Sequence, residues 1–134
     1  MTGFPLKIVT PDGVQFDGTA QQVTVRTTTG DVSILARHIN FVAPLGMGQA
    51  MVLVDGEKRY GACIGGMISV NEGAVTLVPT TFEWADAIDV ARAEASKKRA
   101  EETLSDAKAS DMQLRLAEAR LKRALVRCGV ARKK

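Results

Sequence analysis

The feature that most constrains the fold is an abrupt change in residue types near residue 84. All six aromatic residues, all four prolines and eleven of the twelve glycines lie in residues 1–84. Residues 85–134 hold twelve alanines instead. Glycine, proline, valine and aromatic residues favour turns and strands, whereas alanine, lysine, arginine and glutamate favour helix. We therefore predict two modules, a β-rich one over residues 1–84 and a helical one over residues 85–134.

The same two segments also differ in net charge. The whole chain has a formal net charge of +3. Residues 1–84 hold 5 basic and 7 acidic residues, whereas residues 85–134 hold 13 basic and 8 acidic ones. The balance is therefore −2 in the β-rich module and +5 in the helical one, which supports the same division of the chain.

The composition also excludes several classes of protein. With 46% hydrophobic and 25% charged residues the chain is globular, and wholesale disorder is excluded. The sequence contains no run of 18 apolar residues and no signal-peptide pattern at its start, so we expect no transmembrane segment. Cys63 and Cys128 lie far apart without a partner motif, which indicates a reducing compartment and no metal site.

Turn signals recur at short spacing through the β-rich module. Asp-Gly at 55–56 and Asn-Glu-Gly at 71–73 each separate two apolar runs, which predicts two hairpins. Gly65-Gly66 lies between two predicted strands and indicates a tight turn or bulge. Many short strands linked by such turns are typical of a β-sandwich or barrel.

The helical module is predicted to form an antiparallel hairpin of two helices. Each helix carries one narrow apolar stripe at helical spacing, which lets the two pack closely. The predicted limits are a cap at Asp86 or Asp89, an end near Ser105, a second cap at Ser110 or Asp111, and an end at Gly129. The stripes consist of Ala93, Ala100, Leu104 and Ala107 in the first helix and of Leu114, Ala117, Leu121, Ala124 or Leu125, and Cys128 in the second.

Residues suited to catalysis are sparse. His38 is the only histidine, and without a neighbouring cysteine or carboxylate cluster we interpret it as structural. Cys63 falls inside a predicted strand, where a free cysteine usually acts as a small hydrophobic residue. The sequence contains neither a Walker-type phosphate loop nor a nucleophile elbow. The chain is therefore not expected to be an enzyme, and no cofactor or metal is required.

Arginines of the helical module fall on two helix faces. Arg92 and Arg99 share a face of the first helix, while Arg120, Arg123 and Arg127 share a face of the second. An antiparallel fold about residue 108 or 109 places these faces opposite one another. Guanidinium groups that converge in this way would bind the phosphate of a nucleotide.

Three other interpretations of the basic face remain open. On spacing alone a solvated surface is favoured over a phosphate site, and a docking strip for an acidic protein is a further interpretation. Nucleic acid is disfavoured, because the module lacks aromatic residues for stacking and interleaves its basic residues with Glu94, Glu101, Glu102 and Glu118.

Four segments resemble, in order, the epsilon subunit of bacterial and chloroplast F-type ATP synthases. They are LKIVTPDG at 6–13, GDVSILARH at 30–38, GGMISV at 65–70 and IDVARA at 88–93. The last matches the Ile/Leu-Asp-x-x-Arg-Ala motif of the helical domain in that family. The chain departs from the commoner pattern at Ser33, Arg37 and Ile39-Asn40, which puts the contacts of one loop in doubt.

The resemblance implies a ten-stranded N-terminal β-sandwich, a C-terminal helical hairpin and a non-catalytic role in the rotor. The sandwich would bind the gamma subunit and the c-subunit ring, coupling proton or sodium flow to ATP synthesis. The hairpin would permit ATP hydrolysis when folded down and block it when extended into the head of alpha and beta subunits. The expected location is peripheral, on the cytoplasmic face of the bacterial plasma membrane, with the plastid thylakoid as the less favoured site.

Some family members bind ATP as a regulatory ligand in the folded-down hairpin. Carried over residue by residue, that site corresponds to Glu83, Ile88, Asp89, Arg92, Ala93, Arg99, Arg123 and Arg127. The arginines would hold the phosphates, and the two carboxylates would accept hydrogen bonds from the adenine amino group or the ribose. The alternative is a free-standing nucleotide- or anion-binding module outside any complex.

Overall fold

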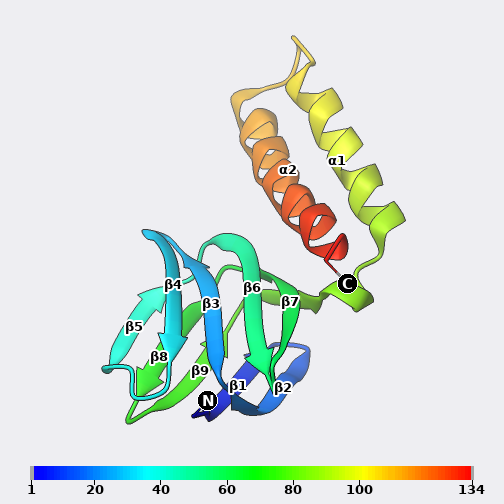
Figure 1. Ribbon diagram of the computed structural model, residues 1–134. Helices are drawn as coiled ribbons and strands as arrows, with labels where there is room; N and C mark the ends of the chain where they lie inside the picture. The colour runs from blue at the N-terminus through cyan, green and yellow to red at the C-terminus, as the bar shows by residue number, and fades with distance from the viewer. Residues whose placement is uncertain (1, 134) are drawn as a thin grey trace.

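The computed structural model describes residues 2–133 and contains ten strands followed by a helical hairpin (Figure 1). The predicted fold class, a β-sandwich followed by two helices, is confirmed. The strands are β1 (Phe4–Thr10), β2 (Gly13–Ala20), β3 (Gln22–Thr27), β4 (Gly30–Leu35), β5 (Phe41–Pro44), β6 (Met47–Val54), β7 (Glu57–Ile64), β8 (Met67–Asn71), β9 (Ala74–Val78) and β10 (Thr81–Trp84).

The strands form two five-stranded sheets that face each other. Their orders are β2-β1-β9-β8-β5 and β10-β7-β6-β3-β4. All described pairings are antiparallel except β1 with β9, which is parallel. Side chains alternate between core and solvent, as in β1, where Leu6 and Ile8 are buried and Lys7 is exposed. The two inner faces together enclose one apolar core.

The predicted hairpins are confirmed, and their turns use left-handed backbone conformations. Asp55 and Gly56 have φ of 51° and 80°, as a two-residue hairpin turn requires. Gly66, between β7 and β8, has φ of 94°, and a Cβ on it would overlap the carbonyl oxygen of Val78. Only glycine fits this position, so the double-glycine turn is a steric requirement of the fold.

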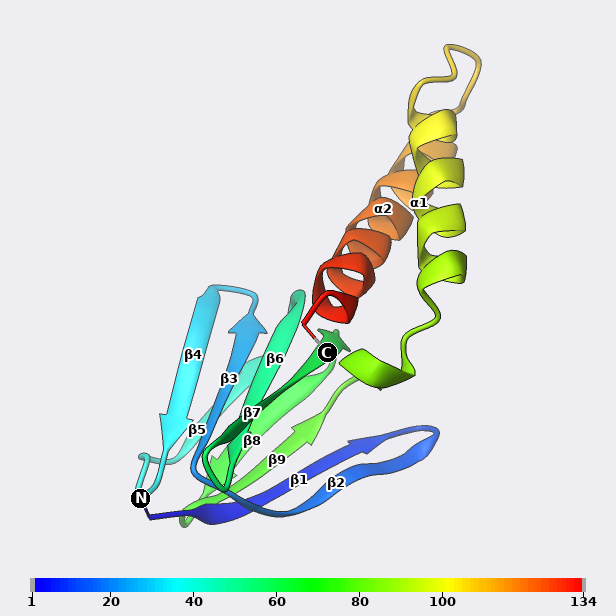
Figure 2. The same cartoon turned by 45° about the vertical axis from the view of Figure 1, so that its right-hand side comes forward.

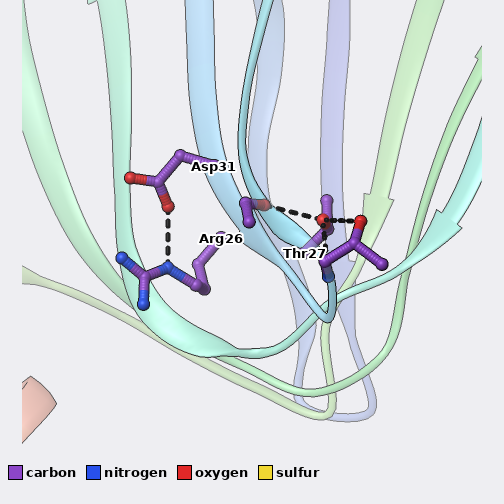
Figure 3. Close-up of polar contacts among 5 residues, drawn as sticks. Arg26, Thr27 and Asp31 are labelled. Carbon is purple, nitrogen blue, oxygen red and sulfur yellow. Dashed lines mark hydrogen bonds and ion pairs between the residues drawn. The ribbon is translucent and has the colours of Figure 1, made fainter.

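Polar side chains close the turn between β3 and β4 (Figure 3). The Thr27 hydroxyl, buried in this turn, donates to the Gly30 carbonyl at 2.7 Å and lies 3.3 Å from the Thr29 hydroxyl. Arg26 Nε donates to Asp31 Oδ1 at 2.7 Å on the exposed side. Because this ion pair is exposed, the buried threonine contributes more to the geometry of the turn.

Two helices follow a short 3₁₀ turn, η1 (Ala85–Ala87). Asp89 caps α1 (Val90–Leu104), and Ser110 forms a capping box with Gln113 at the start of α2 (Asp111–Ala131). Both caps were among the predicted alternatives. Ala107, predicted on the apolar stripe of the first helix, lies exposed in the connecting loop instead, because α1 ends at Leu104.

The prediction that Gly129 ends the second helix is wrong. The helix continues to Ala131, because Val130 and Ala131 are buried against the sandwich. Burial of these two side chains outweighs the low helix propensity of one glycine, which costs about 1 kcal/mol relative to alanine.

Small side chains fill the contact between α1 and α2. Ala93 and Ala100 are buried on α1, and Ala117, Ala124 and Cys128 are buried on α2. At the alternative stripe position, Leu125 is exposed. Residues without long side chains let the helix axes approach closely, but they bury little apolar area.

The hairpin meets the sandwich over a small area at one end of α2 (Figure 2). A separate apolar cluster forms there from Ala62, Ala85, Ile88, Val130 and Ala131, with Tyr60 and Val126 packed against it. The far end of the hairpin projects away from the sheets. Within residues 2–133 no helix is long and apolar enough to span a membrane.

Candidate functional site

A cavity of about 300 Å³ lies at the base of the hairpin, where both helices meet the last strand of the sandwich. Its walls come from β10, from the segment that leads into α1, and from both helices. The lining residues are Glu83, Ile88, Asp89, Arg92, Ala93, Ser96, Arg99, Ala124 and Arg127.

Seven of the eight predicted site residues line this cavity. They are Glu83, Ile88, Asp89, Arg92, Ala93, Arg99 and Arg127. The eighth, Arg123, is half-buried on α2 but does not line the cavity. Arg123 shares a face with Arg127 but lies one helical turn before it, and of the two only Arg127 lines the cavity. Arg120, grouped with Arg123 and Arg127 on one face, is exposed and outside the lining as well.

Sequence reasoning missed two lining residues. Ser96 lies four residues after Arg92 and three before Arg99, so the same helical spacing that linked the arginines also indicated Ser96. Ala124 was assigned only to the apolar stripe. It lines the cavity because its small side chain leaves space between the helices.

One ion pair crosses the cavity from the sandwich to the hairpin. Arg127 Nε on α2 donates to Glu83 Oε1 on β10 at 2.7 Å, with the two side chains 27% and 37% exposed. Glu83 points outward because Phe82 on the same strand points into the sandwich core. The contact is partly shielded from water, which strengthens it relative to a surface pair.

Asp89 has a structural role at the cavity rim. Its Oδ1 accepts the backbone N–H of Arg92 at 3.0 Å and so caps α1. Its second carboxylate oxygen has no hydrogen bond within residues 2–133 and can accept one from a ligand. Ile88 and Ala93, both buried, form the apolar part of the wall.

The cavity carries more positive than negative charge. Arg92, Arg99 and Arg127 line it together with the carboxylates of Glu83 and Asp89. Within residues 2–133, Arg92 and Arg99 form no ion pair, so their N–H groups are available to an anion. Arginines bind phosphate oxygens through paired N–H groups, and carboxylates accept from amino or hydroxyl groups. The arrangement therefore suits a ligand with both an anionic part and a hydrogen-bond donor.

The other candidate residues lie elsewhere. His38 is half-buried in the loop after β4, with its Nδ1 2.8 Å from the Ile39 carbonyl oxygen and its ring against Phe41. Cys63 is buried in the sandwich core, and burial raises its pKa to about 12, so it stays a neutral thiol. In residues 2–133 no group of three histidine, cysteine or carboxylate side chains is placed to hold a metal ion.

Family models match almost the whole chain. Residues 3–85 match the model "ATP synthase, Delta/Epsilon chain, beta-sandwich domain", and residues 86–132 match "ATP synthase, Delta/Epsilon chain, long alpha-helix domain". The chain belongs to the delta/epsilon subunit family of ATP synthase. It is therefore a non-catalytic subunit of that complex, as the resemblance implied.

Bacterial relatives agree with this assignment. The ATP synthase epsilon chain of Ruminococcus albus is 42% identical over 135 residues and covers 100% of both chains. The epsilon chain of Bacillus velezensis is 41% identical over 126 residues and covers 94% of this chain and 95% of its own length.

Solved structures share the fold at lower identity. A chain in the structure of Euglena gracilis mitochondrial ATP synthase (OSCP/F1/c-ring) has a TM-score of 0.80 at 21% identity, covering 91% of this chain and 77% of that one. A chain from the central stalk/c-ring of the Tetrahymena thermophila mitochondrial ATP synthase has a TM-score of 0.65 at 11% identity, with 95% of both chains covered. At these identities the likeness is one of fold.

Proposed function

We propose that this delta/epsilon family chain is a central-stalk subunit of a bacterial F-type ATP synthase and that its hairpin responds to ATP. The sandwich would bind the gamma subunit and the c-subunit ring, so that ion flow is coupled to ATP synthesis. The fold supports this proposal, because the chain shares it with a Tetrahymena thermophila chain described as part of the central stalk and c-ring. Its bacterial relatives favour a peripheral position on the cytoplasmic face of the plasma membrane.

One observation carries the ATP proposal. The cavity draws its walls from α1, α2 and Glu83 of the sandwich, so it is complete only when the hairpin is folded and docked. A ligand that bridges these three elements binds the docked arrangement in preference to an extended one. In this proposal Arg92, Arg99 and Arg127 hold the phosphates, and Asp89 or Glu83 accepts from the adenine amino group or the ribose.

The energy available from such binding matches the small interface that it has to stabilise. At a hundredfold excess of ligand over Kd, binding to the docked state alone stabilises it by about 2.7 kcal/mol. The docked hairpin rests on five buried residues and one ion pair, so a bias of this size changes its population strongly. When released, the basic hairpin would extend toward acidic surfaces of the beta and alpha subunits and restrain ATP hydrolysis.

Thermal unfolding of the isolated chain with and without ATP tests the binding site. ATP should raise the melting temperature of the wild-type chain saturably and of the Arg92→Ala and Arg99→Ala chains far less. Arg115→Ala removes an exposed arginine of α2 outside the cavity and should behave as wild type. Equal effects of ATP on all four chains, or no effect on any, would refute the site.

The proposed inhibition of ATP hydrolysis by the hairpin has to be tested in the assembled ATP synthase. A chain that ends after Trp84 keeps the main sandwich core, which residues 4–82 form, but lacks the hairpin. Assembled with this chain, the synthase should hydrolyse ATP faster than with the full chain. Unchanged hydrolysis would contradict an inhibitory hairpin.

A free-standing nucleotide- or anion-binding module remains the rival proposal, since the cavity alone would serve it equally well. Affinity purification of the tagged chain from native membranes separates the two. A stalk subunit should bring alpha, beta and gamma subunits with it, whereas a free module would be recovered without them.

A further inference from the structure

A second cavity, of about 220 Å³, lies where the end of α2 meets the sandwich. It shares no lining residue with the cavity described above. Its walls come from three segments that are distant in sequence: β7, the junction of β10 with η1, and the residues that follow α2. The side chains that matter here are Lys58, Arg59, Tyr60, Trp84, Asp86 and Lys133.

Two aromatic rings hold two of the cations in place. The Arg59 guanidinium carbon lies 3.9 Å from the centroid of the Trp84 ring, and Lys133 Nζ lies 4.9 Å from that of Tyr60. Stacking uses the flat face of a guanidinium, whereas its N–H donors point outward in its plane. Arg59 is therefore positioned by Trp84 while its donors stay available.

The charges that line this cavity are not balanced by ion pairs within residues 2–133. Lys58, Arg59 and Lys133 bring three positive charges to the lining, and Asp86 is its one acidic residue. Within residues 2–133 none of the three cations forms an ion pair. Cations gathered at one cavity repel one another unless an anion lies among them.

We propose that this second cavity binds a phosphate oxyanion, either free phosphate or the phosphoryl end of a nucleotide. The lining side chains carry a net charge of +2, which matches a dianion. The N–H donors of Arg59 lie in one plane and match the spacing of phosphate oxygens. Lys58 adds a point charge from β7, and Lys133 adds one from the residues that follow α2.

Binding at this position also holds the hairpin down. Lys133 follows the end of α2, whereas Lys58 and Arg59 belong to β7 of the sandwich. An anion that contacts both groups joins the two modules at a place other than the Glu83–Arg127 ion pair. The site shares no residue with the first cavity, so the two can be tested separately, although ligands at both would favour the docked hairpin.

The single tryptophan of the chain, Trp84, reports on this cavity directly. We would titrate inorganic phosphate into the full chain at constant ionic strength, with sodium chloride as the balancing salt, and follow tryptophan fluorescence. The same titration in an Arg92→Ala/Arg99→Ala chain removes two of the three arginines of the first cavity and keeps the Glu83–Arg127 ion pair. A parallel titration with ADP in that double variant distinguishes the two sources of the phosphate group.

A saturable change is expected in both the wild-type and the double-variant chains. Lys133→Gln and Lys58→Gln should each weaken phosphate binding by about tenfold, because each loses a charge-assisted contact. Lys108→Gln removes a lysine from the loop between the helices and should leave binding unchanged. If the fluorescence change saturates at a lower concentration of ADP than of phosphate, the site binds the phosphoryl end of a nucleotide. If it does not, the site binds free phosphate.

Two outcomes would overturn the proposal. One is a fluorescence change that never saturates with phosphate or ADP, or that chloride reproduces. The other is a saturable change that survives in both Lys133→Gln and Lys58→Gln chains but is lost in the Arg92→Ala/Arg99→Ala chain, which would place the anion in the first cavity.

Discussion

Arg127 near the end of α2 donates a hydrogen bond to Glu83 on β10 across 44 residues of sequence, with 2.7 Å between Nε and Oε1. The contact joins the hairpin to the sandwich and lines the first cavity at the same time. The residues that hold the hairpin down are thus also residues that a ligand would touch. A ligand bound in this cavity, as proposed above, would therefore act directly on the contact that joins the hairpin to the sandwich.

Loss of this ion pair should loosen the hairpin without unfolding the sandwich. Arg127→Met keeps much of the apolar stem of the side chain but removes the charge, and the docked state should lose about 1 kcal/mol. Amide hydrogen exchange at the end of α2 should accelerate accordingly, while exchange in the sandwich core stays slow. Lys122→Met is the matched control, because Lys122 pairs with Glu118 at 3.9 Å with both side chains exposed. Equal acceleration in both variants would contradict a specific role for Arg127.

Enlarging a side chain between the helices should separate them. Ala117 is buried in the helix contact, so Ala117→Leu should cost about 1–3 kcal/mol through overpacking. Urea unfolding followed by helical circular dichroism measures the loss. Ala95→Leu adds the same volume at an exposed position of α1 and should leave the stability nearly unchanged. If the two variants unfold alike, the alanine contact does not determine the helix spacing.

The capping role of Asp89 can be separated from its charge. Asp89→Ala removes the acceptor for the Arg92 N–H and should destabilise α1 by about 1 kcal/mol. Asp89→Asn keeps an oxygen acceptor, so α1 should retain its stability, as measured by thermal unfolding followed by circular dichroism. Equal destabilisation by alanine and asparagine would mean that the negative charge, and not the cap, supports the helix.

Stability at alkaline pH should depend on Cys63. Burial raises the pKa of its thiol from 9.0 to about 12 in the folded chain. Between these values the unfolded chain loses the proton and the folded chain keeps it. The contribution of the neutral thiol is therefore complete below pH 9 and is lost as the pH rises toward 12, by about 1.4 kcal/mol per pH unit.

Urea midpoints at several pH values check this dependence. Cys63→Ala should be less stable than wild type by a constant amount below pH 9, because the substitution leaves space in the core. The two chains should then converge as the pH rises further. Parallel curves over the whole range would show that Cys63 does not contribute to the pH dependence.

Local signals in the sequence predicted most of the fold. The turns at 55–56 and 71–73 and both helix caps depend on residues next to one another, so propensity and hydrogen-bonding rules identify them directly. The prediction that the second helix ends at Gly129 failed because packing against Tyr60 and Ala62 on β7 determines where α2 ends. Such a contact between distant segments leaves no local trace in the sequence.

The candidate site was predictable to the extent that it follows helix geometry. Arg92 and Arg99 share a face at a spacing of seven, and antiparallel pairing brings Arg127 opposite. The absence of Arg123 from the lining was not predictable, because Arg123 and Arg127 share a helix face and their spacing does not distinguish them. The second cavity was not predictable from the sequence, because Arg59, Trp84 and Lys133 come from three separate segments.

The parallel pairing of β1 with β9 has a consequence for synthesis of the chain. Leu6 on β1 pairs with Val75 on β9, so the first sheet cannot close until nearly 80 residues have left the ribosome. The hairpin follows the sandwich in sequence, so every strand has left the ribosome before α2 emerges. The surface that receives the end of α2, at Tyr60 and Ala62 of β7, can therefore form first. In an emerging chain, docking of α2 is the last step, and the helix meets a sandwich that is already complete.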